Sequence, residues 1–205
     1  MGLFNKFKKP KTSEEWNNKG VDLYKQGRLE EAIKCFDNAL KLDLNFHEAL
    51  YNKGKVYIKL HEYNEALKCY NNYLKLYPQN EDALFKKGIT LAGMRKHDEA
   101  IKCFDSLIKI NPKFKFGEPW ARKGFSYMKL KRSEDAITCY DNAIAINPVD
   151  EKSWTLKALT LHDLGRLEEA IQCYNAALKI NPNNRVAAEN IIFAGGAATR
   201  KKYRN

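Results

Sequence analysis

Five cysteines are the residues of this chain best suited to redox or metal chemistry, because thiolates form disulfides and bind soft metals. Cys35, Cys69, Cys103, Cys139 and Cys173 lie 34, 34, 36 and 34 residues apart, whereas zinc ligands come in closely spaced pairs. This nearly constant spacing indicates a repeated structural unit. Equivalent positions in neighbouring copies of the unit should be on the order of 10 Å apart, which is too far for a disulfide. We therefore expect buried packing residues, and no metal or other cofactor.

The four histidines do not form a catalytic set. His47, His61, His97 and His162 occupy four different positions of the repeat described below, so they share no helix face. The sequence also contains no glycine-rich phosphate loop, nucleophile elbow or His-x3-His pair. Because no acid, base and nucleophile converge, the prediction is a protein that is not an enzyme.

A unit of about 34 residues recurs five times in the chain. An alanine precedes each cysteine by three positions, and an aromatic residue follows each cysteine directly. The alanines are Ala32, Ala66, Ala100, Ala136 and Ala170. Self-similarity at this period indicates stacked helical hairpins, each too small to bury its own apolar face.

Each unit contains two amphipathic stretches. In the first, apolar residues recur with helical period, as at Trp154, Ala158 and Leu161. A small residue in the middle of this stretch predicts that a second helix comes too close for a larger side chain. The small residues are Gly20, Gly54, Gly88, Gly124 and Ala158. The second stretch is followed by a proline in four units, at Pro78, Pro112, Pro148 and Pro182, which stops the helix.

These residues resemble the tetratricopeptide repeat, whose pattern is Trp-x2-Leu-Gly-x2-Tyr, then Ala-x3-Phe, then Pro. The fourth unit carries the pattern as Trp120, Lys123, Gly124, Tyr127, Ala136, Tyr140 and Pro148. The resemblance covers residues 13–184 and implies an all-α fold: a right-handed superhelical solenoid of antiparallel helical hairpins. It says little about the ligand, because packing residues define the family.

The expected organisation follows from the repeat register. Repeats are expected at 13–46, 47–80, 81–114, 117–150 and 151–184, with an insertion at 115–116, a capping helix at 185–194, and basic tails at 1–12 and 195–205. The insertion should re-angle the stack and expose Phe114 and Phe116. Gly195 and Gly196 should end the capping helix.

A lysine occupies the position where the family often has leucine. These residues are Lys19, Lys53, Lys87, Lys123 and Lys157. The favoured interpretation is edge packing, with each lysine near the acid of its own second helix. Those acids are Glu31, Glu65, Glu99, Asp135 and Glu169. A basic ladder for an acidic ligand is the alternative.

The formal net charge of +11 belongs mostly to the two tails, which contribute +4 each and leave +3 for residues 13–194. Leu3, Phe4 and Phe7 interleave with lysines in the N-terminal tail, so an alternative function is association with an anionic membrane or nucleic acid through the tails. No apolar run is long enough to span a bilayer and no secretory signal is evident, so a cytoplasmic location is expected.

In this family the first helices line a concave groove. Positions 2, 5, 9 and 12 of each unit share one helix side, which includes Glu118, Ala121 and Lys152. The predicted peptide-binding residues are Tyr24, Tyr51, Asn52, Lys55, Ile58, Phe85, Lys86, Ile89, Arg122, Phe125 and Met128. We expect a scaffold or adaptor whose partners are proteins bound through a peptide or helical segment, with no small-molecule substrate. The alternative to a binding surface is that the curvature of the superhelix simply half buries the residues on this helix side.

Overall fold

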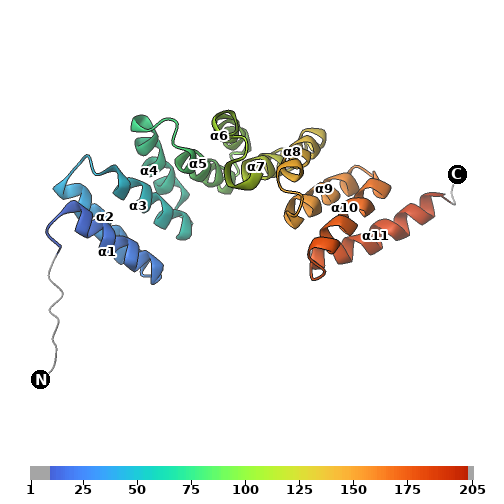
Figure 1. Ribbon diagram of the computed structural model, residues 1–205, viewed down its shortest axis with the longest axis horizontal. Helices are drawn as coiled ribbons and strands as arrows, with labels where there is room; N and C mark the ends of the chain where they lie inside the picture. Colours follow the sequence, from blue (N-terminus) through green and yellow to red (C-terminus); the bar gives the residue numbers. More distant parts are fainter. Residues whose placement is uncertain (1–9, 203–205) are drawn as a thin grey trace, which may run out of the picture. The chain divides into compact units, whose positions relative to one another are not determined.

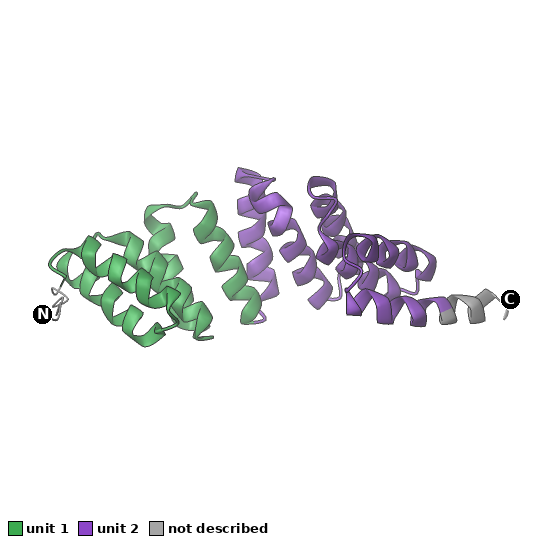
Figure 2. Cartoon of the chain, turned by 60° about the horizontal axis from the view of Figure 1, so that its bottom comes forward, with its two compact units in different colours: residues 1–94 green, residues 95–205 purple. Residues whose placement is uncertain are grey.

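The structure is a computed structural model that describes the backbone of residues 10–202 and the side chains of residues 10–195. The chain divides into two compact units, residues 1–94 and 95–205 (Figure 2). Within the described residues, the first unit is built from α1 (Ser13–Lys25), α2 (Leu29–Leu42), α3 (His47–Lys59), α4 (Tyr63–Leu76) and α5 (Glu81–Gly93) (Figure 1). Within this unit, helices that are consecutive in the sequence pack against each other.

The second unit has the same construction. It contains α6 (His97–Ile110), the short 3₁₀ helix η1 (Phe114–Gly117), α7 (Glu118–Lys129), α8 (Ser133–Ile146), α9 (Glu151–Asp163), α10 (Leu167–Ile180) and α11 (Arg185–Lys202). The core of each unit lies between the helices of its hairpins and between neighbouring hairpins. One cluster collects residues of α8 to α11, and another collects residues of α1 to α3.

In three of the five first helices, an aromatic ring of the second helix leaves no room for a side chain at the small residue. A Cβ atom added to Gly20 would lie 2.6 Å from the Phe36 ring, and one added to Gly54 would lie 2.8 Å from the Tyr70 ring. The same distance separates a Cβ on Gly124 from the Tyr140 ring. These rings are the aromatic residues that follow the cysteines, so the predicted close approach of the two helices is confirmed.

The five cysteines are free thiols, and all are buried. Burial raises the pKa of Cys69 and of Cys139 to about 11. It raises the pKa values of Cys35 and Cys173 as well. The expectation of packing residues is therefore confirmed.

The tight turns inside the hairpins use a left-handed backbone. Gly27 has a φ of 79° and Gly165 a φ of 73°, which glycine adopts without steric cost. His61, Arg95 and Lys131 adopt similar angles of 60°, 59° and 58° at the equivalent turns, where a side chain makes the conformation costly. The turns are therefore set by the packing of the two helices and not by glycine alone.

The lysine column forms ion pairs, but with partners other than those expected. Lys53 Nζ lies 2.6 Å from Asp37 Oδ1, on the second helix of the preceding repeat. Lys123 pairs in the same way with Asp105 at 2.6 Å, and Lys157 with Asp141 at 2.5 Å. Burial opposes the charge on Lys53, but the hydrogen bond to Asp37 and the Coulombic attraction together raise its pKa.

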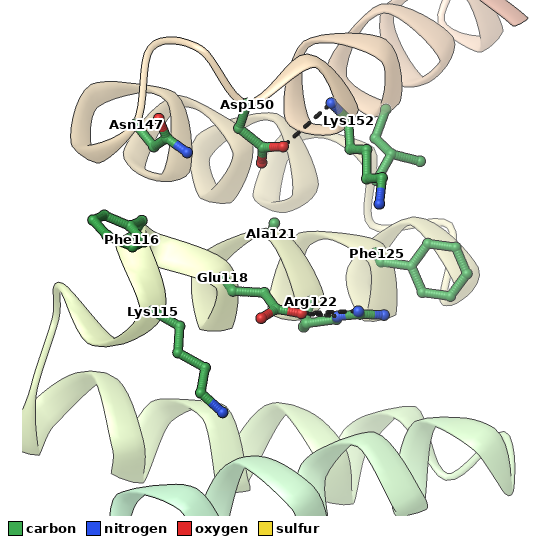
Figure 3. Close-up of a pocket in the computed structure, with 10 residues that line it drawn as sticks. Lys115, Phe116, Glu118, Ala121, Arg122, Phe125, Asn147, Asp150 and Lys152 are labelled. Carbon is green, nitrogen blue, oxygen red and sulfur yellow. Dashed lines mark hydrogen bonds and ion pairs between the residues drawn. The ribbon is translucent and has the colours of Figure 1, made fainter. Parts of the chain in front are cut away.

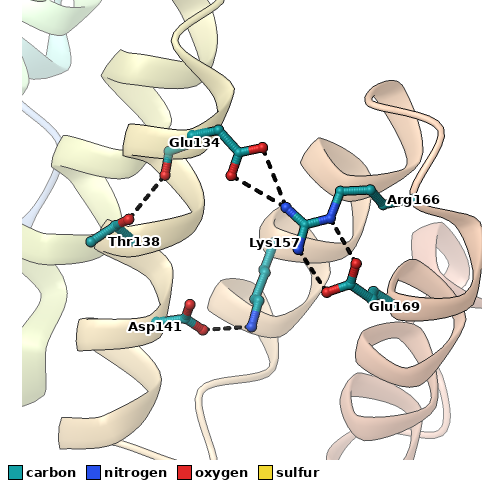
Figure 4. A network of polar contacts seen from close by, with 6 residues as sticks. All are labelled: Glu134, Thr138, Asp141, Lys157, Arg166 and Glu169. Atoms are coloured by element: carbon teal, nitrogen blue, oxygen red, sulfur yellow. Dashed lines mark hydrogen bonds and ion pairs between the residues drawn. The ribbon is translucent and has the colours of Figure 1, made fainter.

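The acids expected to pair with the lysine column instead pair locally. These contacts are Arg28–Glu31, Lys68–Glu65, Lys96–Glu99, Arg132–Asp135 and Arg166–Glu169, each between residues three apart. Arg166 in addition reaches Glu134 on α8, at 3.2 Å (Figure 4). Arg166 and Lys157 thus give α8 two polar links to the following hairpin.

Two expectations about local structure were wrong. The helix that begins at Arg185 continues to Lys202 and does not stop at Gly195, so the tail expected at 195–205 is helical through residue 202. Alanine is the best helix former, and Ala194, Ala197 and Ala198 flank the two glycines and offset their poor propensity. At the insertion, Phe116 is 78% exposed, but Phe114 is buried at 8%.

We predict that Gly165→Ala lowers the free energy of unfolding by about 1 kcal/mol, because an L residue is strained at this φ. No atom lies within 4 Å of the added Cβ, so the effect is purely one of backbone conformation. The matched change Lys131→Gly should be stabilising by about 0.5–1 kcal/mol at the equivalent turn. Urea denaturation measures both, and a destabilising Lys131→Gly would contradict the assignment.

The thiols should resist alkylation in the folded protein. A raised pKa means less thiolate at mildly alkaline pH, and burial blocks the reagent as well. We expect slow labelling by iodoacetamide in native buffer and rapid labelling of all five cysteines in guanidinium. The free energy of unfolding should be highest below the ordinary thiol value of 9.0 and should fall as pH rises toward about 11, the value for Cys69. Rapid native labelling of all five thiols would show that they are not packed.

Candidate functional site

The α7–α9 hollow is a depression of about 550 Å³ in the second unit. It is lined by Lys115, Phe116, Glu118, Ala121, Arg122, Phe125, Asn147, Asp150, Lys152 and Leu156. Figure 3 shows it bounded by α7 on one side and by the segment from Asn147 to Lys152 on the other. Three stretches of the chain therefore form it: the insertion, the exposed face of α7, and the start of α9 with the loop before it.

The insertion places Phe116 at the hollow. Lys115 and Phe116 have φ values of 44° and 55°, a left-handed conformation that is costly for residues with a side chain. Gly117 follows with a φ of 85°, and a Cβ there would lie 3.2 Å from Ile146. Phe114 buries its ring while Phe116 is turned out toward solvent. The two extra residues thus supply an exposed aromatic side chain that a uniform 34-residue repeat would lack.

α7 contributes a charged pair and an aromatic ring. Arg122 Nη2 donates to Glu118 Oε1 at 2.9 Å, one helical turn away. Phe125 is half-buried, and Lys129 Nζ lies 5.1 Å from its ring centroid. Ala121 between them leaves the floor of the hollow open, because it carries only a methyl group.

The start of α9 is fixed by its capping residue. Asp150 accepts hydrogen bonds from the backbone N–H of Lys152 at 3.3 Å and from Ser153 Oγ at 2.5 Å. An N-cap acid satisfies the free N–H groups of the first turn and so holds the helix start in place. Lys152 and Leu156, one turn apart on α9, consequently project at defined positions.

A second depression, the α9–α11 hollow, has a volume of about 410 Å³. Its lining consists of Glu151, Lys152, Thr155, Leu156, Leu159, Asn181, Asn184 and Val186. Asn184 Nδ2 donates to Thr155 Oγ1 at 2.8 Å and to Glu151, and its side-chain oxygen accepts from the N–H of Ala187. Because Lys152 and Leu156 line both hollows, the two hollows lie next to each other along α9. We call the combined surface the unit 2 groove.

The groove combines apolar anchors with charges of both signs. Lys115, Arg122 and Lys152 face Glu118 and Asp150 in the α7–α9 hollow, which leaves one positive charge in excess. The lining of both hollows contains neither histidine nor cysteine. Among the described residues, no cluster of three or more metal-ligating side chains occurs. The lining of the groove thus consists of apolar surface next to charged side chains of both signs.

The structure brings together three of the predicted residues in the first unit. Lys55 Nζ lies 5.5 Å from the Tyr24 ring centroid and 5.7 Å from that of Tyr51. Burial, followed by the negative charge of Asp82, raises the pKa of Tyr51 to about 12. Asn52 Nδ2 donates to Asn17 Oδ1 on α1 at 3.0 Å. These residues link α1 to α3, so their contacts within the unit account for them without a ligand.

The remaining predicted residues differ in accessibility. Phe85 is only 2% exposed, which corrects its expected place on a binding surface. Ile58, Lys86 and Ile89 are half-buried on α3 and α5. Met128 Sδ lies 4.0 Å from Tyr140 Oη, which donates to it. Of the eleven predicted residues, Arg122 and Phe125 line the unit 2 groove.

Several residues that line the groove were not among the peptide-binding residues predicted from the sequence. Glu118, Ala121 and Lys152 belong to the helix stripe that the register predicted, so the same signal contains them. Asn147 and Asp150 come from the connection between repeats. Helical periodicity does not predict which way side chains point in such a connection. Phe116 was expected to be exposed just before α7, but nothing in the sequence showed that its ring would line a hollow between α7 and α9.

Most of the basic N-terminal tail and the last three residues of the C-terminal tail lie beyond what the structure describes. Residues 1–9 and 203–205 are outside the described residues, and with them Leu3, Phe4 and Phe7. At the first described turn, Thr12 and Glu15 form a capping box that begins α1. Within the described part of the chain, none of the helices combines the length and hydropathy needed to cross a bilayer.

Family models place the chain among known proteins. Models described as tetratricopeptide repeat match residues 47–80, 82–113, 118–150 and 151–184, and one described as TPR repeat matches residues 20–61. Together they cover more than half of the sequence. The chain therefore belongs to the tetratricopeptide repeat family, and the predicted all-α fold of helical hairpins is confirmed. A search of curated proteins gave no match.

Solved structures share this fold at low identity. YrrB, described as a TPR protein with an unusual peptide-binding site, is 20% identical with a TM-score of 0.74, covering 87% of this chain and 91% of that one. MamA 41-end from Desulfovibrio magneticus RS-1 is 18% identical with a TM-score of 0.79, covering 84% and 97%. TTC0263, a thermophilic TPR protein from Thermus thermophilus, is 21% identical with a TM-score of 0.65, covering 89% and 98%.

Proposed function

We propose that this protein–protein interaction scaffold binds an extended or helical segment of another protein in the unit 2 groove. The observation that carries the proposal is that the two hollows are neighbours and share Lys152 and Leu156 in their linings. Volumes of about 550 and 410 Å³ fall in the range of ligand pockets, and two such hollows in succession fit consecutive side chains of one chain.

The lining indicates the chemistry of the bound segment. Phe116, Phe125 and Leu156 provide apolar surface for one or two anchoring side chains. Aromatic anchors at the centre of a contact, surrounded by polar groups, are the usual arrangement of a recognition site. The excess of one positive charge in the α7–α9 hollow favours a segment with an acidic residue next to its apolar anchor.

The family supports an adaptor role for the chain. Tetratricopeptide repeats generally act as non-enzymatic interaction modules, and the groove contains no catalytic constellation. The printed description of YrrB attributes a peptide-binding site to that protein. By analogy, we propose that the present chain binds a peptide in the unit 2 groove. This proposal rests on the geometry of α7, α9 and α11.

The test is a selection from a displayed peptide library followed by calorimetry on the intact chain. Peptides that bind should contain an apolar or aromatic anchor flanked by an acid. The double variant Arg122→Ala with Phe125→Ala should weaken binding at least about tenfold, or about 1.4 kcal/mol, because it removes an anchor contact and a charge.

The matched control is the double variant Lys109→Ala with Ile110→Ala. It removes one base and one apolar side chain at the exposed end of α6, outside both hollows. Its affinity should equal that of the unaltered chain, and thermal unfolding should show both variants folded. Equal peptide affinity of the groove variant and the control would refute the proposal.

A further inference from the structure

Two of the five column lysines lack the aspartate partner of the others: Lys19, which has no preceding repeat, and Lys87, which has one. Lys53, Lys123 and Lys157 each pair with an aspartate on the second helix of the preceding repeat. The equivalent partner of Lys87 is residue 71, which is an asparagine. Among the described residues, Lys87 has no carboxylate within ion-pair distance. The half-buried lysine is retained at this position while its counter-charge is lost.

A depression of about 590 Å³ lies at this position in the first unit. It is lined by Lys68, Asn71, Asn72, Leu74 and Lys75 of α4 and by Lys87 of α5. Residues 68, 71, 72 and 75 share one helix side because they are three or four positions apart. The α4 stripe therefore faces Lys87 across a hollow with three ammonium groups and no acid in its lining. We call it the α4–α5 hollow.

The existing polar contacts leave donors available there. Lys68 Nζ is engaged by Glu65 at 2.6 Å, so one of the three positive charges is already neutralised. Lys75 Nζ makes a long contact of 3.4 Å with the Asn72 side-chain oxygen. Lys75 and Lys87 thus supply two positive charges without a paired carboxylate. The amides of Asn71 and Asn72 add neutral N–H donors.

We propose that the α4–α5 hollow is a binding site for a phosphate group, held by Lys75 and Lys87 and by the amides of Asn71 and Asn72. Two ammonium groups match the charge of a phosphate dianion, and its oxygens accept several hydrogen bonds at once. The same atoms would hold inorganic phosphate or a phosphate monoester, since both present these oxygens. An aspartate at residue 71 would occupy this place with its own carboxylate, as it does in the paired repeats.

The proposed site is distinct from a groove along the first helices. Lys87 stands two residues from both Phe85 and Ile89, which corresponds to about 200° around a helix. Its side chain therefore leaves α5 on the side opposite to the groove stripe. Phosphate binding here is independent of the peptide groove in the second unit, and either proposal stands if the other fails.

The experiment is a titration of the full-length ¹⁵N-labelled chain with inorganic phosphate at constant ionic strength, balanced with chloride. Amide signals of residues 68–75 and 87 should shift in a saturable manner. Asn71→Asp should weaken phosphate binding at least about tenfold, because the new carboxylate pairs with Lys87 and repels the anion. The same variant should also raise the melting temperature. A parallel titration with phenyl phosphate distinguishes free phosphate from a monoester as the preferred ligand.

Asn175→Asp is the matched control. It makes the same change at the same repeat position on α10. The residue 16 positions later, which corresponds to Lys87, is Ile191, so the new carboxylate has no lysine of this column to pair with. Phosphate affinity should remain within about twofold of the unaltered chain. Absence of saturable shifts, or equal loss of affinity in both variants, would overturn the proposal.

Discussion

The contact between an aromatic ring of the second helix and a glycine of the first determines how closely the two helices pack in the α1–α2, α3–α4 and α7–α8 hairpins. At Gly20, Gly54 and Gly124 the ring of the second helix lies where a Cβ atom would be, within 2.6 to 2.8 Å. Packing of this density leaves little room for adjustment, so each of these three hairpins holds a fixed geometry. The cysteine that precedes each ring is buried as well, and the alanine column is fully enclosed.

The packed hairpins in turn position the unit 2 groove. Tyr140 packs against Gly124 on the buried side of α7, and this fixes the rotation of α7 about its axis. Arg122 and Phe125 then face the α7–α9 hollow. Ion pairs between hairpins, such as Lys157 with Asp141, set the angle at which α9 follows α8. The lysines of these pairs are mostly buried and the aspartates are exposed, so each pair stabilises the stack by about 1 kcal/mol or less.

The periodic part of the structure was predictable from the sequence, and the local departures from it were not. Spacing identified the hairpins, the glycine contacts and the buried thiols, because each depends on neighbours within one repeat. The lysine partners were misassigned because they belong to the preceding repeat, whose angle the sequence does not specify. Phe85 was misplaced because a helix stripe does not show how much of it a neighbouring helix covers. The direction of Phe116 depends on the left-handed backbone at Lys115, which only the structure reveals.

The most direct test of the account is the free energy of unfolding of Gly54→Ala, measured by urea denaturation in three backgrounds. With Tyr70 present, or with Tyr70→Phe, the ring remains and the added methyl should be destabilising by about 1–3 kcal/mol. With Tyr70→Leu the ring is gone, and the better helix propensity of alanine should make the change neutral or stabilising by up to about 1 kcal/mol. A cost of Gly54→Ala that is the same in all three backgrounds would contradict the central role of the glycine–aromatic contact.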